Sequence, residues 1–226
     1  MNVKRMQSIN SSTIYTDLLD KIISLKYKPG EGLSENELCE VYGATRHAIR
    51  GALAILKEKG LIEVQPQRGT NVSLIDLKFI DDIIFLRSAI EQETLHFILK
   101  NDDNTELVKQ LRKCLDKQIQ AEDSGVKSQE FYKLDDEFHD TLLAAAGRKS
   151  VQKIYADAYL QVRRWRNMEV SAQARIASLP QEHKKIVDAI EKRDEAEARR
   201  LMFSHIDSVG LFGEEMRHKY PEYFVQ

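Results

Sequence analysis

The clearest structural signature in this chain is the segment Gly43-Ala44-Thr45-Arg46-His47-Ala48-Ile49-Arg50-Gly51-Ala52-Leu53. Residues four apart share one face of a helix, so Arg46 and Arg50 point the same way. The opposite face, which can pack inward, consists of Ile49, Ala52, Leu53 and Leu56. Arginine suits guanine edges and phosphates, because its planar guanidinium bonds bidentately. A helix with a buried back, a cationic front and a preceding glycine turn predicts a helix that reads the DNA major groove.

The segments around this helix complete a small domain. Ser34-Glu35-Asn36-Glu37 is a capping box, in which the serine caps the amide three residues on and the last glutamate reaches back. Thr45 is a favourable N-cap, and Lys59-Gly60 is a favourable helix end. The expected helices cover residues 9–27, about 35–41 and about 46–59, and the expected strands cover 61–64 and 70–74. Three helices followed by a hairpin predict a winged helix-turn-helix.

The pattern changes after residue 75, where strand signals disappear. The expected helices run over residues 78–100, 104–123, 128–146, 149–172, 180–193 and 194–218. The breaks between them contain turn or cap residues, such as Asn101-Asp102-Asp103-Asn104 and Leu179-Pro180. Helices joined by short loops favour an antiparallel bundle. The sequence therefore predicts a mainly α protein, with a winged helix-turn-helix domain over residues 1–75 and an all-helical domain of about six helices over residues 76–226.

The composition is compatible with this division. The chain has 226 residues, of which 42% are hydrophobic and 31% charged, which suits two modest packed domains. The formal net charge is -2, but residues 1–75 carry +2 and residues 76–226 carry -4, which allows a nucleic-acid-binding domain at the N-terminus. Cys39 and Cys114 form no metal-type motif, and we expect no disulfide framework. We see no signal peptide or membrane span, so we expect a cytoplasmic protein without a membrane partner.

Four side chains of the second domain have the chemistry of a metal site. Asp135 and His139 stand four residues apart, so both project from one helix face. His183 lies near the start of the fifth expected helix of this domain, and His205 lies inside the sixth. Imidazole nitrogens with one carboxylate suit a divalent transition metal such as zinc, and facing helices of a bundle often build such sites. From spacing alone, a solvated or packed histidine remains the more frequent explanation.

The arginines of the second domain admit two interpretations each. Arg87 lies in an apolar helical stretch, either as an ion-pair partner of Glu91 four residues on or as a clamp for a ligand carboxylate. Spacing alone favours the ion pair. The run Arg163-Arg164-Trp165-Arg166 is compatible with a nucleic-acid surface, but we expect a helix surface with Arg163 facing inward.

Five motifs of the N-terminal region resemble a known family. They are Lys28-Pro29-Gly30, Leu33-Ser34-Glu35-Asn36-Glu37-Leu38, Thr45 to Leu53, Gly60-Leu61-Ile62 and Arg68-Gly69-Thr70-Asn71-Val72. This pattern is similar to that of GntR-type transcription factors of the FadR branch, whose second domain is the all-helical FCD ligand-binding domain. The resemblance covers the chain from about residue 10 to residue 218.

The resemblance implies which residues meet DNA. These are Asn36, Thr45, Arg46, His47, Arg50, Arg68 and Gly69. Arg46 and Arg50 would contact the operator, and Arg68 would place the wing at the minor groove. Asn36 stands where relatives often have arginine, His47 replaces the usual threonine, and Gly51 replaces the usual glutamate. These departures imply an operator that differs from the common one, and the sequence offers no physical reason for Gly51.

The second domain carries the matching histidine elements. Asp135-Asp136-Glu137-Phe138-His139, Glu182-His183 and Met202-Phe203-Ser204-His205 resemble three elements of the FCD domain. The resemblance makes the metal ligands Asp135, His139, His183 and His205. Arg148 stands after Gly147, where the family often has asparagine. Such a cation near a pocket mouth would either change which acid is accepted or simply point into water.

These observations predict a transcriptional regulator and not an enzyme. We expect a homodimer that binds a pseudo-palindromic operator, with repression relieved by ligand as the commoner pattern of the resembling family. A small carboxylate effector would bind at the metal, which we expect to be zinc, with nickel second. Its binding residues would be Arg87, Arg148 and Arg163. The alternatives are a metal-sensing regulator, a purely structural metal site and a metal-dependent hydrolase, which would need a general base that the spacing does not reveal.

Overall fold

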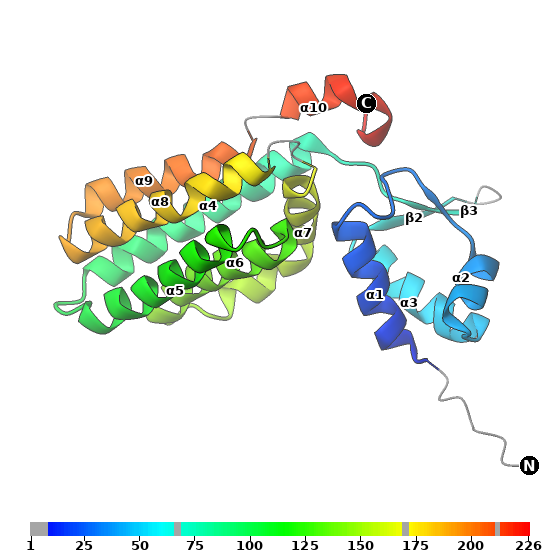
Figure 1. Ribbon diagram of the computed structural model, residues 1–226, viewed down its shortest axis with the longest axis horizontal. Coiled ribbons are helices and arrows are strands. Elements are labelled where there is room, and N and C mark those ends of the chain that lie inside the picture. The colour runs from blue at the N-terminus through cyan, green and yellow to red at the C-terminus, as the bar shows by residue number, and fades with distance from the viewer. Residues whose placement is uncertain (1–8, 66–68, 169–171, 211–212) are drawn as a thin grey trace, which may run out of the picture. The chain divides into compact units, whose positions relative to one another are not determined.

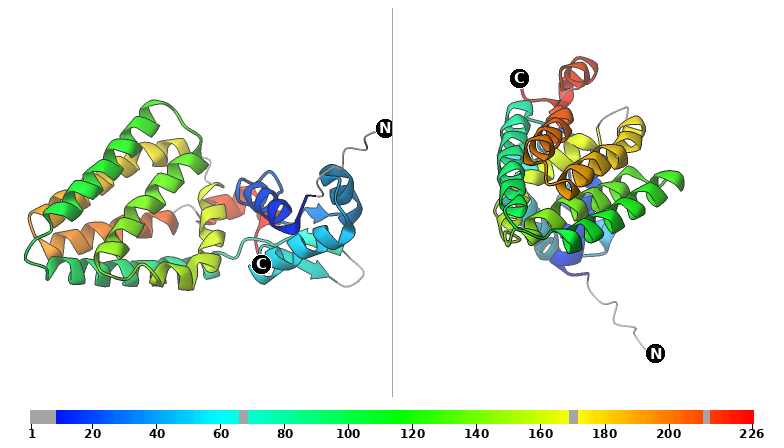
Figure 2. Two further views of the ribbon diagram at one scale, coloured as in Figure 1. Left: turned by 90° about the horizontal axis from the view of Figure 1, so that it is seen from below. Right: turned by 90° about the vertical axis from the view of Figure 1, so that its left-hand side faces the viewer.

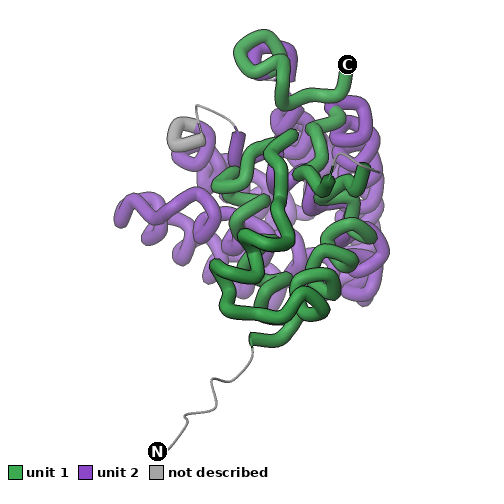
Figure 3. The backbone as a smooth tube through the Cα atoms, turned by 90° about the vertical axis from the view of Figure 1, so that its right-hand side faces the viewer, with its two compact units in different colours: residues 1–76, 217–226 green, residues 77–216 purple. Residues whose placement is uncertain are grey.

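The helices of the chain gather into two units, which Figure 3 distinguishes by colour. The computed structural model describes residues 9–65, 69–168, 172–210 and 213–226. The first unit comprises the chain up to Asp76 together with residues 217–226, and the second comprises Leu77–Met216. The expected fold class is confirmed, because a winged helix-turn-helix is followed by a helical bundle.

The first unit combines three helices with a small sheet (Figure 1). Its elements are α1 (Ser11–Ile23), β1 (Gly32–Leu33), α2 (Glu35–Tyr42), α3 (Arg46–Glu58), β2 (Ile62–Gln65) and β3 (Gly69–Val72). The side chains of Asn10, Ser34 and Thr45 accept hydrogen bonds from the first turns of the three helices, as N-caps do. The sheet is antiparallel in the order β1-β3-β2. The expected hairpin is therefore present, and the sequence pattern missed only the two-residue strand β1.

The contact between α1 and α3 explains the unusual glycine of the reading helix. Ile14 and Leu18 of α1 are fully buried, as is Ile49 of α3. A Cβ atom at Gly51 would lie 2.8 Å from the Oγ atom and 3.2 Å from the Cβ atom of Ser11, so the serine hydroxyl would have to rotate away. A side chain at this position would also require Ser11 to shift by a few tenths of an ångström, so glycine suits the close approach of the two helices.

The C-terminal tail packs within the first unit. The backbone amide of Ile75 donates to the carbonyl of Tyr223 at 2.8 Å, and the amide of Val225 donates to the carbonyl of Ile75 at 2.9 Å. Phe224, between these two bonds, is only 2% exposed. The structure thus groups residues 217–226 with the first unit, whereas the sequence analysis assigned the whole of 76–226 to the second domain.

In the described residues, the second unit is a bundle of six long helices, which Figure 2 shows side by side. They are α4 (Leu77–Leu99), α5 (Thr105–Asp123), α6 (Ser128–Ala145), α7 (Val151–Arg166), α8 (Ala172–Glu191) and α9 (Glu195–Asp207). The 3-10 turn η1 (Ser208–Gly210), α10 (Gly213–Lys219) and the 3-10 turn η2 (Pro221–Tyr223) follow. In the bundle α4 packs against α9, and α5 packs against α6 and α8. Among the described helices, we find none with the length and apolar character that a membrane crossing requires.

Helix α8 differs from its expected course. The sequence analysis placed a break at Leu179-Pro180, but the helix continues through Pro180. Proline costs about 3 kcal/mol inside a helix, because its amide is missing and its ring crowds the preceding turn. Ile176 and Leu179 are buried against Phe131 of α6, and burial of such side chains stabilises by about 1.5–3 kcal/mol each. Packing in the bundle therefore offsets the local preference for a break.

Candidate DNA-binding surface and metal centre

Helix α3 presents the expected cationic face to solvent. Thr45, Arg46, His47 and Arg50 are all exposed, while Ala48 and Ile49 are buried on the other side of the helix. The Nη2 atom of Arg46 donates to Oδ1 of Asn36 at 2.9 Å, and the Nε atom of Arg50 lies 3.0 Å from a carboxylate oxygen of Glu35. Helix α2 thus holds both guanidinium groups on the exposed face, where a DNA duplex can reach them.

Turn geometry orients this face and the wing. Gly43 adopts the left-handed conformation with φ of 58° and ends α2, and Thr45 then accepts a hydrogen bond from the amide of Ala48 at 3.3 Å. Gly69 begins β3 with φ of 91°, a conformation that favours glycine. Arg68, the expected minor-groove residue of the wing, lies outside the described residues.

Four buried side chains from three helices meet in the second unit. Asp135 and His139 come from α6, His183 from α8 and His205 from α9, and one ligand atom of each lies within 4.8 Å of those of the others. The Nε2 atom of His205 is 3.2 Å from that of His139 and 3.1 Å from that of His183. The Oδ1 atom of Asp135 is 3.5 Å from Nε2 of His183 and 4.0 Å from Nε2 of His139. The structure therefore brings together all four of the expected metal ligands.

An oxygen acceptor fixes the tautomer of each histidine. The Nδ1 atom of His139 contacts Glu91, that of His183 lies 2.8 Å from Oε1 of Gln118, and that of His205 lies 2.8 Å from Oε2 of Glu182. A carboxylate or amide oxygen can only accept, so each Nδ1 carries the proton and each Nε2 keeps its lone pair. The side chain of Gln118 is itself oriented, because its Nε2 atom donates to the carbonyl of Leu134 at 3.0 Å. Such outer partners hold metal-binding histidines in place.

The charges around the histidines maintain these protonation states. Burial would raise the pKa of Glu91, but His139 and Arg87 outweigh it and lower the pKa to about 2. Burial would likewise raise the pKa of Glu182, but hydrogen bonds from His205 and Arg175 lower it to about 2. Both carboxylates are therefore ionised and accept the Nδ1 protons.

Three of the four ligand groups are also in the forms that bind metal. Burial would raise the pKa of Asp135, but the cation of Arg166, 2.9 Å from Oδ2, holds it well below the ordinary value. Burial lowers the pKa of His183 far below its ordinary value and also lowers that of His205. Neutral imidazoles and an ionised carboxylate are the forms required by a divalent cation.

The donor set fits a cation. Among the described residues, Oδ1 of Asp135 accepts no hydrogen bond although it is buried, and a buried polar atom without a partner is costly. Three imidazole lone pairs point at the same small region, where they repel one another unless a cation lies between them. Two nitrogens bound at right angles about 2.1 Å from one metal ion would be about 3.0 Å apart. The observed separations of 3.1 and 3.2 Å are close to that value.

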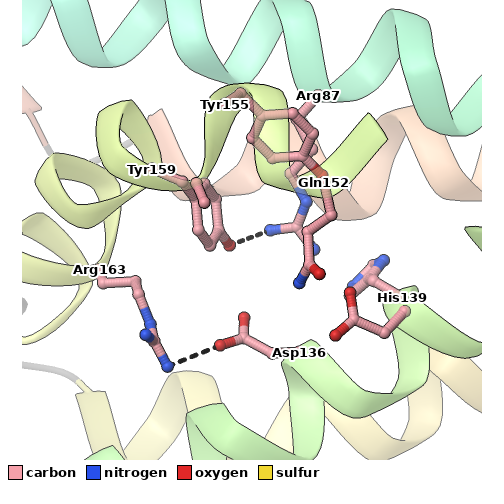
Figure 4. Close-up of a pocket in the computed structure, with 9 residues that line it drawn as sticks. Arg87, Asp136, His139, Gln152, Tyr155, Tyr159 and Arg163 are labelled. Atoms are coloured by element: carbon pink, nitrogen blue, oxygen red, sulfur yellow. Dashed lines mark hydrogen bonds and ion pairs between the residues drawn. The ribbon is translucent and has the colours of Figure 1, made fainter. Parts of the chain in front are cut away.

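A cavity adjoins this cluster (Figure 4). His139 belongs to both, and the expected ligand residues Arg87 and Arg163 also line the cavity. Arg87 is buried and ion-paired with Glu91 at 2.6 Å, and it also contacts the hydroxyl of Tyr159. Both interpretations of Arg87 are thus compatible with its position. Arg148 lies elsewhere: it is exposed, and its guanidinium carbon is 5.2 Å from the centre of the Phe97 ring.

The sequence analysis did not predict a functional role for several residues that surround the cluster. Glu182 precedes His183 directly, and Glu91 follows Arg87 by one helical turn, so both had local signals. Gln118 has no such signal, because only the packing of α5 brings it to the cluster. Arg166 belongs to the run that was expected at the helix surface with Arg163 facing inward. That expectation is wrong, because Arg164, Trp165 and Arg166 are buried while Arg163 is only half-buried. Asp136 and Asp140 flank the metal ligands on α6, and their place in the cavity wall depends on α7.

Comparisons with known proteins agree with this arrangement. The family model for bacterial regulatory proteins of the gntR family matches residues 10–72, and the FCD domain model matches residues 82–208. An HTH-type transcriptional regulator in an unstable DNA locus of Streptomyces ambofaciens is 32% identical, over 96% of this chain and 90% of its own length. The HTH-type transcriptional repressor RspR of Escherichia coli (strain K12) is 26% identical, over 97% and 95% of the two chains.

A solved structure shares the fold. The crystal structure of a putative GntR transcriptional regulator from Rhodococcus sp. RHA1 aligns with a TM-score of 0.72 and 18% identity, over 93% of this chain and 98% of its own. The relatives are transcriptional regulators, so the metal-dependent hydrolase considered as an alternative finds no support among them. The chain belongs to the GntR family of bacterial regulatory proteins, with an FCD domain after its winged helix, and is a DNA-binding transcriptional regulator.

Proposed function

We propose that the protein is a repressor that binds a pseudo-palindromic operator as a homodimer and releases it when a small carboxylate binds at a metal ion in the second unit. The metal is zinc, with nickel as the second choice. The observation that carries this proposal is the cluster of Asp135, His139, His183 and His205, with three free imidazole lone pairs and an unsatisfied carboxylate oxygen beside a cavity that contains an arginine.

Operator binding rests on α3 and the wing. Arg46 and Arg50 reach base edges and phosphates, Thr45 and His47 lie beside them, and Gly69 shapes the start of β3. Two copies related by two-fold symmetry match two half-sites about one helical turn of DNA apart. Because affinity comes largely from phosphate contacts, the dissociation constant rises steeply with salt concentration.

Effector binding rests on the cluster and on Arg87. A bound divalent metal would supply positive charge that offsets the desolvation of an acid, which the apolar interior of a bundle cannot do. Arg87 lies in the wall of the same cavity, where its guanidinium can meet the second oxygen of the carboxylate. Four protein ligands leave room on a six-coordinate ion for an oxygen from the effector.

Release of the operator requires that the effector distinguish two states. A ligand shifts an equilibrium only by the difference between its affinities for the two states. The effector therefore binds more tightly to the arrangement of the dimer that cannot span both half-sites. A metal-sensing regulator would use the same ligands but would respond to the ion alone, and the cavity beside His139 favours an additional small molecule.

The test starts from operator fragments identified by genomic footprinting. Fluorescence anisotropy should show tight binding by the native protein and at least a tenfold loss in Arg50→Ala, with unchanged circular dichroism. Elemental analysis should find about one metal ion per chain, which the double variant His139→Ala with His205→Ala should lose. Undiminished operator binding by Arg50→Ala, or full metal content in the double variant, would contradict the proposal. Release of the operator by zinc or nickel alone would favour the metal sensor instead.

A further inference from the structure

Two side-chain pairs join the start of α2 to the exposed face of α3. Glu35 and Asn36 stand in the first turn of α2, and Arg46 and Arg50 stand one turn apart on α3. The Nε atom of Arg50 donates to both carboxylate oxygens of Glu35, at 3.0 and 3.1 Å. The Nη2 atom of Arg46 donates to Oδ1 of Asn36 at 2.9 Å. The two helices pack on each other (Figure 1), so one rigid support carries both pairs.

The pair of Arg50 and Glu35 leaves hydrogen-bonding groups of both side chains available. Only Nε serves the carboxylate, and within the described part of the chain the two Nη groups of Arg50 have no other partner. These groups form the end of the guanidinium, whose parallel donors fit O6 and N7 of guanine. The single Nε hydrogen is shared by the two oxygens of Glu35, so each oxygen keeps a lone pair for another donor. The pair therefore presents donors beside an acceptor, and the ion pair fixes their relative positions.

Asn36 presents a donor instead. Arginine can only donate, so the amide of Asn36 turns its oxygen toward Arg46 and its Nδ2 group away. Glu35 differs, because a carboxylate can only accept. A carboxylate also repels phosphates, and phosphate contacts carry no direct information about sequence. The place of Glu35 beside Arg50 therefore favours a role at base edges.

One base pair matches this arrangement of donors and acceptor. In the major groove, a C·G pair shows the amino group of cytosine, which is a donor, next to O6 and N7 of guanine, which are acceptors. A T·A pair places O4 of thymine, an acceptor, where the cytosine amino group would lie. The carboxylate of Glu35 would accept a hydrogen bond from the cytosine and repel the thymine. Arg50 alone could read the guanine, and Glu35 adds a contact that depends on the opposite base.

We propose that Glu35 is a specificity residue of the operator-binding face, and that Arg50 and Glu35 together read both bases of one C·G pair. Arg50 contacts the guanine through its Nη groups, and Glu35 contacts the cytosine through its carboxylate. This inference rests on the proposed function, because it assumes that α3 lies in the major groove. It goes further by adding a carboxylate of α2 to the reading surface and by naming the base pair that it selects.

The test first locates the base pair that Arg50 contacts. Operator fragments from genomic footprinting are changed one base pair at a time, and fluorescence anisotropy gives the dissociation constants of the native protein and of Arg50→Ala. The position sought is the one at which Arg50→Ala loses most of the native discrimination between base pairs. The native protein should prefer C·G there, and a preference for another base pair would overturn the inference. If Arg50→Ala discriminates as well as the native protein at every position, the base contact of Arg50 in the proposed function fails as well.

A second comparison separates Glu35 from Arg50. At the located position, Glu35→Gln should lower the preference for C·G over T·A about tenfold. A hydrogen bond to a charged acceptor changes affinity by about that factor, and the glutamine amide can donate to O4 of thymine. Glu37→Gln removes the same charge from an exposed position in the same turn of α2, and it should leave the preference unchanged.

The ratio of the two affinities, rather than either affinity alone, decides the role of Glu35. Circular dichroism verifies that both variants are folded. If Glu35→Gln changes binding to the C·G and T·A operators by the same factor, Glu35 only orients Arg50 or repels phosphates. That result would refute the inference and leave the proposed function standing.

Discussion

Replacing Gln118 by methionine tests whether the second unit is built around a metal ion. The side chain is fully buried on α5, and its Oε1 atom accepts the Nδ1 proton of His183 at 2.8 Å. Methionine has a similar length and is flexible enough to fill the same space. It can neither accept the proton of His183 nor donate to the carbonyl of Leu134. The change therefore removes the support of one proposed ligand while retaining the packing.

The expected magnitude follows from two separate effects. Without metal, the variant leaves the Nδ1 proton of buried His183 without its acceptor, which costs about 1–3 kcal/mol of unfolding free energy. With metal, loss of an outer partner lowers metal affinity about 10–100-fold, or about 1.4–2.7 kcal/mol. Binding stabilises the folded state according to the ratio of free metal to the dissociation constant. At about 2–4 °C per kcal/mol, the rise in Tm on adding zinc should be smaller by about 3–11 °C.

The assay follows the circular dichroism at 222 nm during heating, with EDTA and with excess zinc, and measures the zinc dissociation constant by competition with a fluorescent chelator. Gln120→Met is the matched control, because Gln120 is an exposed residue of the same helix. It should alter neither the zinc affinity nor the rise in Tm. If Gln118→Met lowers the Tm in EDTA but keeps the native zinc affinity, Gln118 is only a packing residue and His183 does not bind the ion.

Three further changes probe other parts of the molecule. Arg46→Ala should raise the operator dissociation constant about 10–100-fold by fluorescence anisotropy, since a bidentate base contact is worth about 1–3 kcal/mol; a change under twofold would contradict its contact with bases. Phe224→Ala should lower the free energy of unfolding of the first unit, measured in urea, by about 3–5 kcal/mol. Val225→Ala, at a half-exposed position, should have little effect. Equal effects of the two substitutions would refute the packing role of the tail. In EDTA, burial lowers the pKa of His183 in the folded protein, so below about pH 6.5 the unfolded chain binds more protons than the folded chain. The free energy of unfolding should therefore be highest above about pH 6.5 and should fall as the pH drops toward 5. His218→Gln should leave this slope of Tm against pH unchanged, and a native slope of zero would refute the neutral buried imidazole.

Local chemistry was enough to predict most helices. Residues 104–123 were expected from their turn residues and periodicity, and α5 spans Thr105–Asp123. The caps at Ser34 and Thr45 were also predicted, because a capping side chain and its amide partner lie within three residues. Such features depend on neighbours in sequence, which is why pattern analysis finds them.

Features that depend on distant contacts were not predictable in the same way. Strand β1 has only two residues, and its pairing with β3 defines it. Phe224 lies near the C-terminus but packs in the first unit, and no local sequence pattern predicts its contact with Ile75. Pro180 gave a clear signal for a break, but burial of its neighbours on α8 outweighs it. In each case tertiary packing decides the outcome.

The residues of the candidate site fall into the same two groups, those that local sequence predicts and those that only the fold brings together. The spacing of Asp135 and His139 places two ligand atoms on one helix face, but spacing cannot bring His183 and His205 to that face. The family resemblance identified His183 and His205 as ligands, because members of one family share the fold that brings these residues together. Gln118 was out of reach of both approaches, since it stands on a fourth helix and acts through His183.

One chain of contacts connects the four-residue cluster with the cavity, and under the proposed function we expect it to make the affinities for metal and effector interdependent. The Nδ1 atom of His139 contacts Glu91, Glu91 pairs with Arg87, and Arg87 reaches the hydroxyl of Tyr159 in the cavity wall. An acid that draws the guanidinium of Arg87 toward itself weakens its hold on Glu91, which leaves that carboxylate freer to polarise His139. A more basic imidazole binds a cation more tightly. Because linkage is reciprocal, we expect the proposed effector to strengthen metal binding by the same factor by which the metal strengthens effector binding.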